Sequence, residues 1–76
     1  MKTRALRALY ELVPGRYVQL PDDPTCWEIV AVSGTTASSL ASQKWCWLRR
    51  DANTYRQIKG SAQLRMLRLV SETRKG

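Results

Sequence analysis

The chain reads KWCWLRRDANTYRQIK at residues 44–59. We expect Lys44–Arg50 and Thr54–Lys59 to form two β-strands. Asp51-Ala52-Asn53 lies between them, and Asx residues favour a tight turn at such a position. This stretch therefore predicts a β-hairpin, around which the rest of the fold is arranged.

The hairpin predicts a mixed aromatic and basic surface. Successive side chains of a strand point to opposite faces, so pairing through the turn places Trp45, Trp47, Arg49, Tyr55 and Lys59 on one side. Such a surface suits single-stranded nucleic acid, because bases stack on the rings while the cations neutralise phosphates. The alternative is that the tryptophans fill the core, since the chain has no Phe and Trp is highly buried on average. An N-terminal helix would then cover at least one of Trp45 and Trp47.

Three more strands are expected around the hairpin. Cys26–Ser33 is rich in β-branched and aromatic residues, and Arg16–Leu20 alternates with period two. A short helical turn is expected near Ala62–Leu64, before a last strand at Met66–Val70. Composition predicts loops at residues 21–25 and 34–43.

The N-terminal segment is expected to be helical. Leu6, Leu9, Tyr10 and Val13 recur at helical spacing, and Pro14-Gly15 ends the segment. The sequence thus predicts a single α+β domain over residues 1–76. It consists of a helix at 1–13, a β domain at 16–70 and a flexible tail at 71–76. The β domain is expected to be a four- or five-stranded antiparallel sheet or an SH3-like, partly open barrel.

Positive charge is sorted along the sequence. The net charge is +7, from 13 Lys and Arg against 6 Asp and Glu. Residues 17–43 hold no Lys or Arg and contain Asp22, Asp23 and Glu28, whereas both ends are basic. A field of this kind steers encounters with nucleic acid or with acidic protein surfaces. Few acids are near the basic residues of the last three elements, so we predict a binding surface that contains Arg49, Arg50, Arg56, Lys59, Arg65 and Arg68. The hairpin residues Lys44 and Tyr55 are further predicted binding residues.

Composition argues against an enzyme. Histidine is absent, the four glycines are isolated, and Cys26 and Cys46 are expected to be reduced, buried thiols. We therefore expect no catalytic residue, metal or cofactor. No apolar run is long enough to span a bilayer, which predicts a cytoplasmic protein. The alternative for the basic N-terminus is an amphipathic helix on an anionic membrane.

In length, charge and predicted element order, the whole chain resembles the small basic regulators of host RNA polymerase encoded by lytic bacteriophages, of the antiterminator type found in a Xanthomonas phage. The resemblance implies binding to RNA polymerase near its RNA exit region in the host bacterial cytoplasm. Initiation would be inhibited, or transcription would pass terminators. Lys2, Arg4 and Arg7 would be candidate polymerase contacts, and we expect a monomer.

A second resemblance is more local. Arg56-Gln57-Ile58-Lys59 and the downstream Ala62-Gln63-Leu64-Arg65 are similar to a segment of the plasmid-encoded type B dihydrofolate reductases. Those are SH3-like barrels that tetramerise around an active pore, which Gln57 and Ile58 would line. Lys59 stands where that family has tyrosine. Three functions therefore stay open: a transcription regulator, a stand-alone DNA- or RNA-binding barrel, and an oligomeric reductase.

Overall fold

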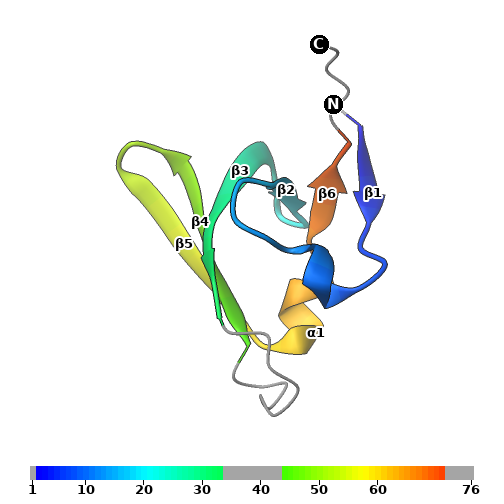
Figure 1. Cartoon of the computed structure of the whole chain (residues 1–76). Helices are drawn as coiled ribbons and strands as arrows, with labels where there is room; N and C mark the ends of the chain where they lie inside the picture. The colour runs from blue at the N-terminus through cyan, green and yellow to red at the C-terminus, as the bar shows by residue number, and fades with distance from the viewer. Residues whose placement is uncertain (1, 34–43, 72–76) are drawn as a thin grey trace.

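The computed structural model describes residues 2–33 and 44–71, which form one curled antiparallel sheet (Figure 1). Its strands are ordered β1-β6-β2-β3-β4-β5. In Figure 1 the pair β4–β5 and the pair β6–β1 stand on opposite sides of the molecule, with α1 at one end between them. The elements in chain order are β1 (Thr3–Ala5), the 3-10 helix η1 (Leu9–Glu11), β2 (Tyr17–Leu20), β3 (Asp23–Val32), β4 (Trp45–Asp51), β5 (Thr54–Lys59), α1 (Ser61–Leu64) and β6 (Arg68–Val70).

The predicted N-terminal helix at residues 1–13 is wrong. Residues 3–5 instead form β1, which pairs with β6 along the far edge of the sheet. Leu12 is buried and Leu6 and Leu9 pack against the core, whereas Tyr10 is 76% exposed. The apolar residues that face the core, Leu6, Leu9 and Leu12, are thus three apart, which is the period of a 3-10 turn rather than of an α-helix. A short isolated helix is marginal in water, and pairing with β6 is the more stable alternative.

The predicted α+β class is therefore also wrong. The described residues are mostly antiparallel sheet, with six strands rather than four or five, and their helical parts are the four-residue α1 and η1. None of these helices is long and apolar enough to cross a membrane. The predicted loop at 34–43 and all of the predicted tail except Ser71 lie outside the described residues.

β3 is longer than the sequence predicts, because it begins inside the predicted loop at 21–25. The Asp23 carboxylate accepts hydrogen bonds from the backbone N–H of Thr25, at 2.9 Å, and from its hydroxyl, at 2.6 Å. A register shift between Gln19 and Leu20 brings Leu20 opposite Asp23. These contacts leave a short turn at residues 21–22 between β2 and β3.

The predicted hairpin is present as β4 and β5. β5 has the predicted bounds, and the turn is stabilised by the Asp51 carboxylate, which accepts a 3.0 Å hydrogen bond from the Asn53 N–H. After β5 the chain passes Gly60, whose φ of 90° lies in a region that glycine adopts without strain. Its N–H donates to the Lys44 carbonyl at 2.7 Å, and α1 follows directly.

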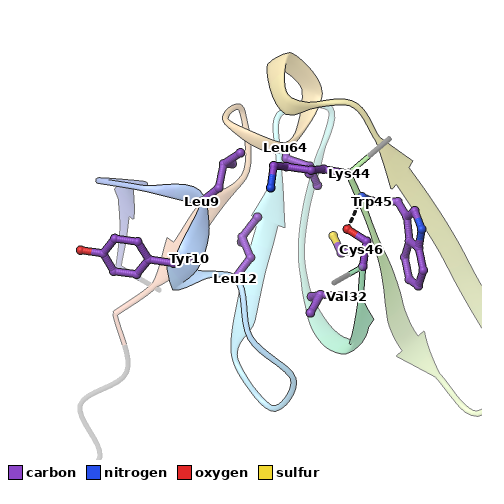
Figure 2. Close-up of a pocket in the computed structure, with 9 residues that line it drawn as sticks. Leu9, Tyr10, Leu12, Val32, Lys44, Trp45, Cys46 and Leu64 are labelled. Carbon is purple, nitrogen blue, oxygen red and sulfur yellow. Dashed lines mark hydrogen bonds between the residues drawn. The ribbon is translucent and has the colours of Figure 1, made fainter. Parts of the chain in front are cut away.

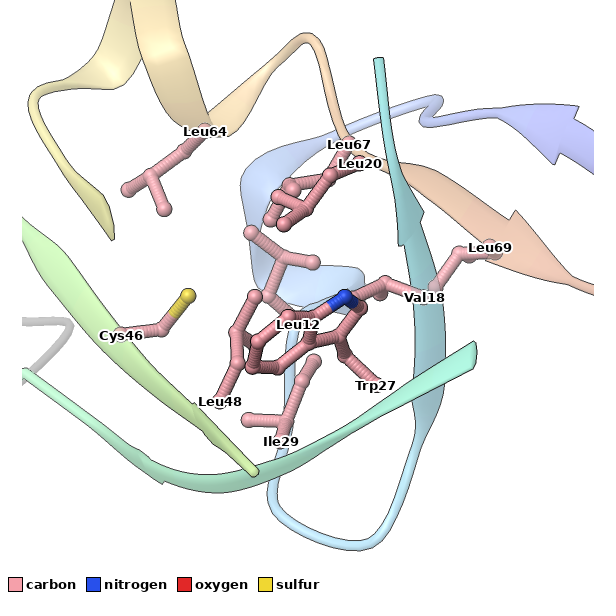
Figure 3. Close-up of a cluster of buried hydrophobic side chains, with 10 residues drawn as sticks. All are labelled: Leu12, Val18, Leu20, Trp27, Ile29, Cys46, Leu48, Leu64, Leu67 and Leu69. Carbon is pink, nitrogen blue, oxygen red and sulfur yellow. The ribbon is translucent and has the colours of Figure 1, made fainter. Parts of the chain in front are cut away.

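The core lies inside the curl of the sheet (Figure 3). Trp27 is 3% exposed and is the tryptophan that fills the core. Its indole N–H forms no hydrogen bond of normal geometry. The Asp23 carboxyl lies nearby, and its pKa is lowered first by the hydrogen bonds from Thr25 and to a smaller extent by this indole. The buried apolar residues are Leu12, Val18, Leu20, Trp27, Ile29, Cys46, Leu48, Leu64, Leu67 and Leu69.

Candidate nucleic-acid interface

The outer face of the β4–β5 hairpin combines rings and cations. Along β4, Cys46 and Leu48 are buried, so the residues between them face outward. Figure 2 shows the Trp45 ring on the other side of its strand from the Cys46 thiol. We name this outer surface the aromatic–cationic face; it consists of Trp45, Trp47, Arg49, Tyr55, Gln57 and Lys59.

Its side chains form three cross-strand pairs. Trp45 lies opposite Lys59, Trp47 opposite Gln57, and Arg49 opposite Tyr55. The bond from the Gly60 N–H to the Lys44 carbonyl belongs to the same register and marks that neighbouring pair as hydrogen-bonded. Because such pairs alternate along an antiparallel ladder, the three face pairs are the non-hydrogen-bonded ones, in which side chains approach most closely. The sequence-based prediction that these residues share one surface is confirmed.

The rings on this face are accessible to a ligand. Trp47 is 38% exposed and Tyr55 is 52% exposed, while Trp45 is half-buried. The alternative that an N-terminal α-helix covers Trp45 or Trp47 is wrong, because the elements in that segment are the strand β1 at residues 3–5 and the 3-10 helix η1 at residues 9–11. Among the three tryptophans, Trp27 is the one that is buried in the core.

Arg49 connects the aromatic–cationic face to β2 and β3. The register places Tyr17 of β2 opposite Glu28, Glu28 opposite Arg49, and Arg49 opposite Tyr55. These four side chains form one row across the sheet. Arg49 Nη2 donates to Glu28 Oε1 at 3.1 Å, and the pKa of Arg49 is raised, first by its interaction with Tyr55 and then by the Glu28 charge.

The structure corrects the expectation that the cations lack acidic neighbours. Strand β3 lies beside β4, and the turn before it lies near β5, so the acidic middle of the sequence meets the basic hairpin. Each of the five acids in the described residues lies within 4.0 Å of an arginine nitrogen. The pairs are Arg4–Glu11 at 2.7 Å, Arg49–Glu28 at 3.1 Å, Arg50–Asp23 at 3.2 Å, Arg56–Asp22 at 3.3 Å and Arg50–Asp51 at 4.0 Å.

The predicted binding residues therefore do not form one patch. Arg49, Tyr55 and Lys59 come together on the aromatic–cationic face, whereas Arg56 shares the inner side of β5 with Ile58. Arg50 covers the ring of Trp27, Arg4 is paired with Glu11, and Arg68 donates to Thr3. Within residues 2–33 and 44–71, seven cations form no ion pair: Lys2, Arg7, Arg16, Lys44, Lys59, Arg65 and Arg68.

Sequence reasoning missed Tyr17 and Glu28. Tyr17 is 48% exposed and borders the hollow that Glu28 and Arg49 line. The sequence signal that could have identified Tyr17 is the alternation of β2, in which Val18 and Leu20 point inward and Tyr17 points outward. The link to Arg49 needs the registers of two strand pairs, which the sequence alone does not provide.

A second cavity, of about 140 Å³, lies on the inner side of β4 (Figure 2). Its walls are largely apolar and include Leu9, Leu12 and Leu64, with Lys44 at its edge. Burial raises the pKa of the Cys46 thiol in this cavity to about 11, so the thiol stays protonated at neutral pH and is a poor nucleophile. The described residues contain no group of three or more acids and cysteines that could hold a metal ion.

No known protein family, curated protein or solved structure matches this chain. The two residues that the reductase resemblance assigns to a pore lie on opposite faces of β5. Gln57 stands beside Trp47 on the outer face, and Ile58 packs against the core.

Proposed function

We propose that the protein is a non-enzymatic cytoplasmic module that binds single-stranded nucleic acid through the aromatic–cationic face. The three close cross-strand pairs carry this proposal, because they place Trp45, Trp47 and Tyr55 beside Lys59 and Arg49 on an accessible surface. Aromatic rings for stacking and cations for phosphates are the two components of sequence-tolerant single-strand binding.

The spacing of the rings favours a single strand over a duplex. Trp45 and Trp47 are two residues apart in β4, which separates their Cα atoms by roughly 6.8 Å. Bases within one strand of a duplex rise by only about 3.4 Å. Successive bases therefore meet both rings only in an extended chain whose bases have unstacked.

The ion pairs on the surface do not oppose this function strongly. Arg49 and Glu28 are both partly exposed, and exposed pairs contribute little to stability. Lys59, which forms no ion pair among the described residues, is available for phosphate directly. Binding is thus expected to depend on a small number of cations and to weaken with salt.

Tryptophan fluorescence at low salt tests the proposal, with an oligothymidylate of about eight nucleotides as the ligand. We expect quenching in the wild type and at least about fivefold weaker binding for Trp47→Ala, since one stacked base contributes ~1–3 kcal/mol. Tyr10→Ala removes an exposed ring outside the face and is the matched control. Equal losses of oligothymidylate affinity in Trp47→Ala and Tyr10→Ala, or no binding by the wild type, would contradict the proposal.

A role in transcription is a further part of the proposal and comes from the resemblance to phage regulators in length and charge, since β1 replaces the predicted N-terminal helix. Of its expected polymerase contacts, Lys2 and Arg7 form no ion pair in the described residues, whereas Arg4 is held by Glu11. Retention of RNA polymerase from a bacterial lysate on the immobilised protein would support this role. Retention that is unchanged in the variant Lys2→Glu/Arg7→Glu would remove these two residues from the contact.

A further inference from the structure

A hollow beside the aromatic–cationic face has room for one nucleobase. It measures about 350 Å³ and is lined by Tyr17, Cys26, Glu28 and Arg49 and by residues 50–52 at the end of β4 and in the turn after it. This volume lies within the range of small-ligand sites in proteins. We propose that it holds one base of the bound strand and favours cytosine or guanine over thymine or uracil. The inference rests on the proposed function and gives that surface a base preference.

The Glu28–Arg49 pair presents acceptors and donors side by side. The pair is joined by one hydrogen bond, from Arg49 Nη2 to Glu28 Oε1. Glu28 Oε2 and the other guanidinium N–H groups, one of which interacts with Tyr55, take no part in this bond. Both side chains are partly exposed, with 29% of Glu28 and 44% of Arg49 accessible. A ligand that fits this edge must donate to the carboxylate and accept from the guanidinium.

Cytosine and guanine have such an edge. Cytosine carries its amino donor beside two acceptors, N3 and O2, and guanine carries two donors, N1–H and its amino group, beside the acceptor O6. Either base can form three hydrogen bonds with the pair. Thymine and uracil have no amino group, and their single N–H lies between two carbonyl oxygens, which a carboxylate repels. Adenine offers one amino donor and one ring-nitrogen acceptor, so it can form two hydrogen bonds with the pair.

Tyr17 supplies a stacking surface for the same base. Its ring is 48% exposed, and its neighbour across the strand pair is Glu28. A base that lies on Tyr17 can therefore turn its edge toward Glu28 and Arg49. The preference also accounts for the Glu28 carboxylate beside the aromatic–cationic face. This carboxylate lowers the affinity for any polyanion, but it gains a hydrogen bond wherever a base offers an amino group.

The test compares oligothymidylates that differ at one central nucleotide, which is thymine, cytosine, guanine or adenine. For the wild type at low salt, we expect the cytosine or the guanine oligomer to bind at least about fivefold more tightly than the all-thymine oligomer, the low end for a good side chain–base pair. Glu28→Gln is expected to reduce this ratio to within about twofold. Asp22→Asn, which also removes one acid that pairs with an arginine, is expected to keep it.

The outcomes separate this inference from the proposed function. Equal binding of all four oligomers by the wild type, tightest binding of the adenine oligomer, or a ratio that survives Glu28→Gln would overturn the base preference and leave nucleic-acid binding intact. Failure of the wild type to bind any oligomer would overturn both. Thermal unfolding of each variant confirms that the ratios are compared between folded proteins.

Discussion

The guanidinium carbon of Arg50 lies 5.1 Å from the centre of the Trp27 ring. The same guanidinium pairs with Asp23 at 3.2 Å, and Asp23 is the first residue of the strand that contains Trp27. One side chain at the end of β4 thus shields the large ring of the core and holds the start of β3. The arginine that sequence analysis assigned to a binding surface has a structural role in this fold.

Two substitutions of Arg50 distinguish the stability that comes from its stacking on Trp27 from the stability that comes from its charge. A partly exposed cation–π contact contributes about 0.5–1 kcal/mol, so Arg50→Ala is expected to lower the free energy of unfolding by that amount. Arg50→Lys keeps a charge near Asp23 but lacks the planar group, and we expect it to recover only part of the loss. Urea unfolding followed by circular dichroism measures both. An unchanged midpoint for Arg50→Ala would show that the contact does not stabilise the fold.

Substitution of the core tryptophan is expected to lower stability, whereas substitution of a tryptophan on the aromatic–cationic face is expected to weaken binding. Trp27 is 3% exposed, so Trp27→Ala should destabilise the protein by about 3–5 kcal/mol, enough to unfold a small domain, and Trp27→Phe should cost less. Trp47 is 38% exposed, and Trp47→Ala should change stability by less than about 1 kcal/mol while it weakens nucleic-acid binding. Thermal unfolding and oligonucleotide titration of the same samples distinguish the two. A large loss of stability in Trp47→Ala would place that ring in the core.

The hairpin and its outer face were predictable because the relevant signals are local. The turn residues lie between two short strands, and a period of two then determines which side chains share a surface. Trp45 and Lys59 meet across this hairpin without help from the rest of the chain.

The remaining features depend on contacts between distant parts of the sequence. Thr3 pairs with Val70, and this long-range pairing replaces the helix that the spacing of Leu6, Leu9 and Tyr10 predicts. The prediction from the charge pattern, that the cations lack acidic neighbours, was wrong for a related reason. Segments with opposite charge are separate along the chain, but neighbouring strands bring them together, so Glu28 meets Arg49.

The Arg4–Glu11 pair predicts a loss of stability in acid. Hydrogen bonds from Arg4 and from the Arg7 N–H lower the pKa of Glu11 from its ordinary 4.5 to about 2. The unfolded chain therefore takes up a proton at Glu11 before the folded protein does. The stabilisation is complete above the ordinary pKa and is lost as the pH falls from about 4.5 toward about 2.

Glu11→Gln isolates this contribution from those of the other acids, since Asp23 and Asp51 also have lowered pKa values. We expect the variant to be less stable than the wild type at pH 7 and the difference to shrink as the pH approaches 2. Urea midpoints at a series of pH values measure the difference. A gap between the two proteins that stays constant over this range would contradict the role assigned to the Glu11 charge.

Lys59 is expected to contribute a phosphate contact. Lys59 stands opposite Trp45 on the aromatic–cationic face and forms no ion pair among the described residues. Lys59→Glu should therefore weaken oligothymidylate binding and reduce the slope of log affinity against log salt by about 0.7, the value for one phosphate of a single strand. Arg7→Glu makes the same change of charge outside the face, at a residue that is also without an ion pair in residues 2–33 and 44–71, and serves as its control. If net charge alone drives binding, the two variants will lose affinity equally and their salt slopes will change together, which would remove the face from the binding site.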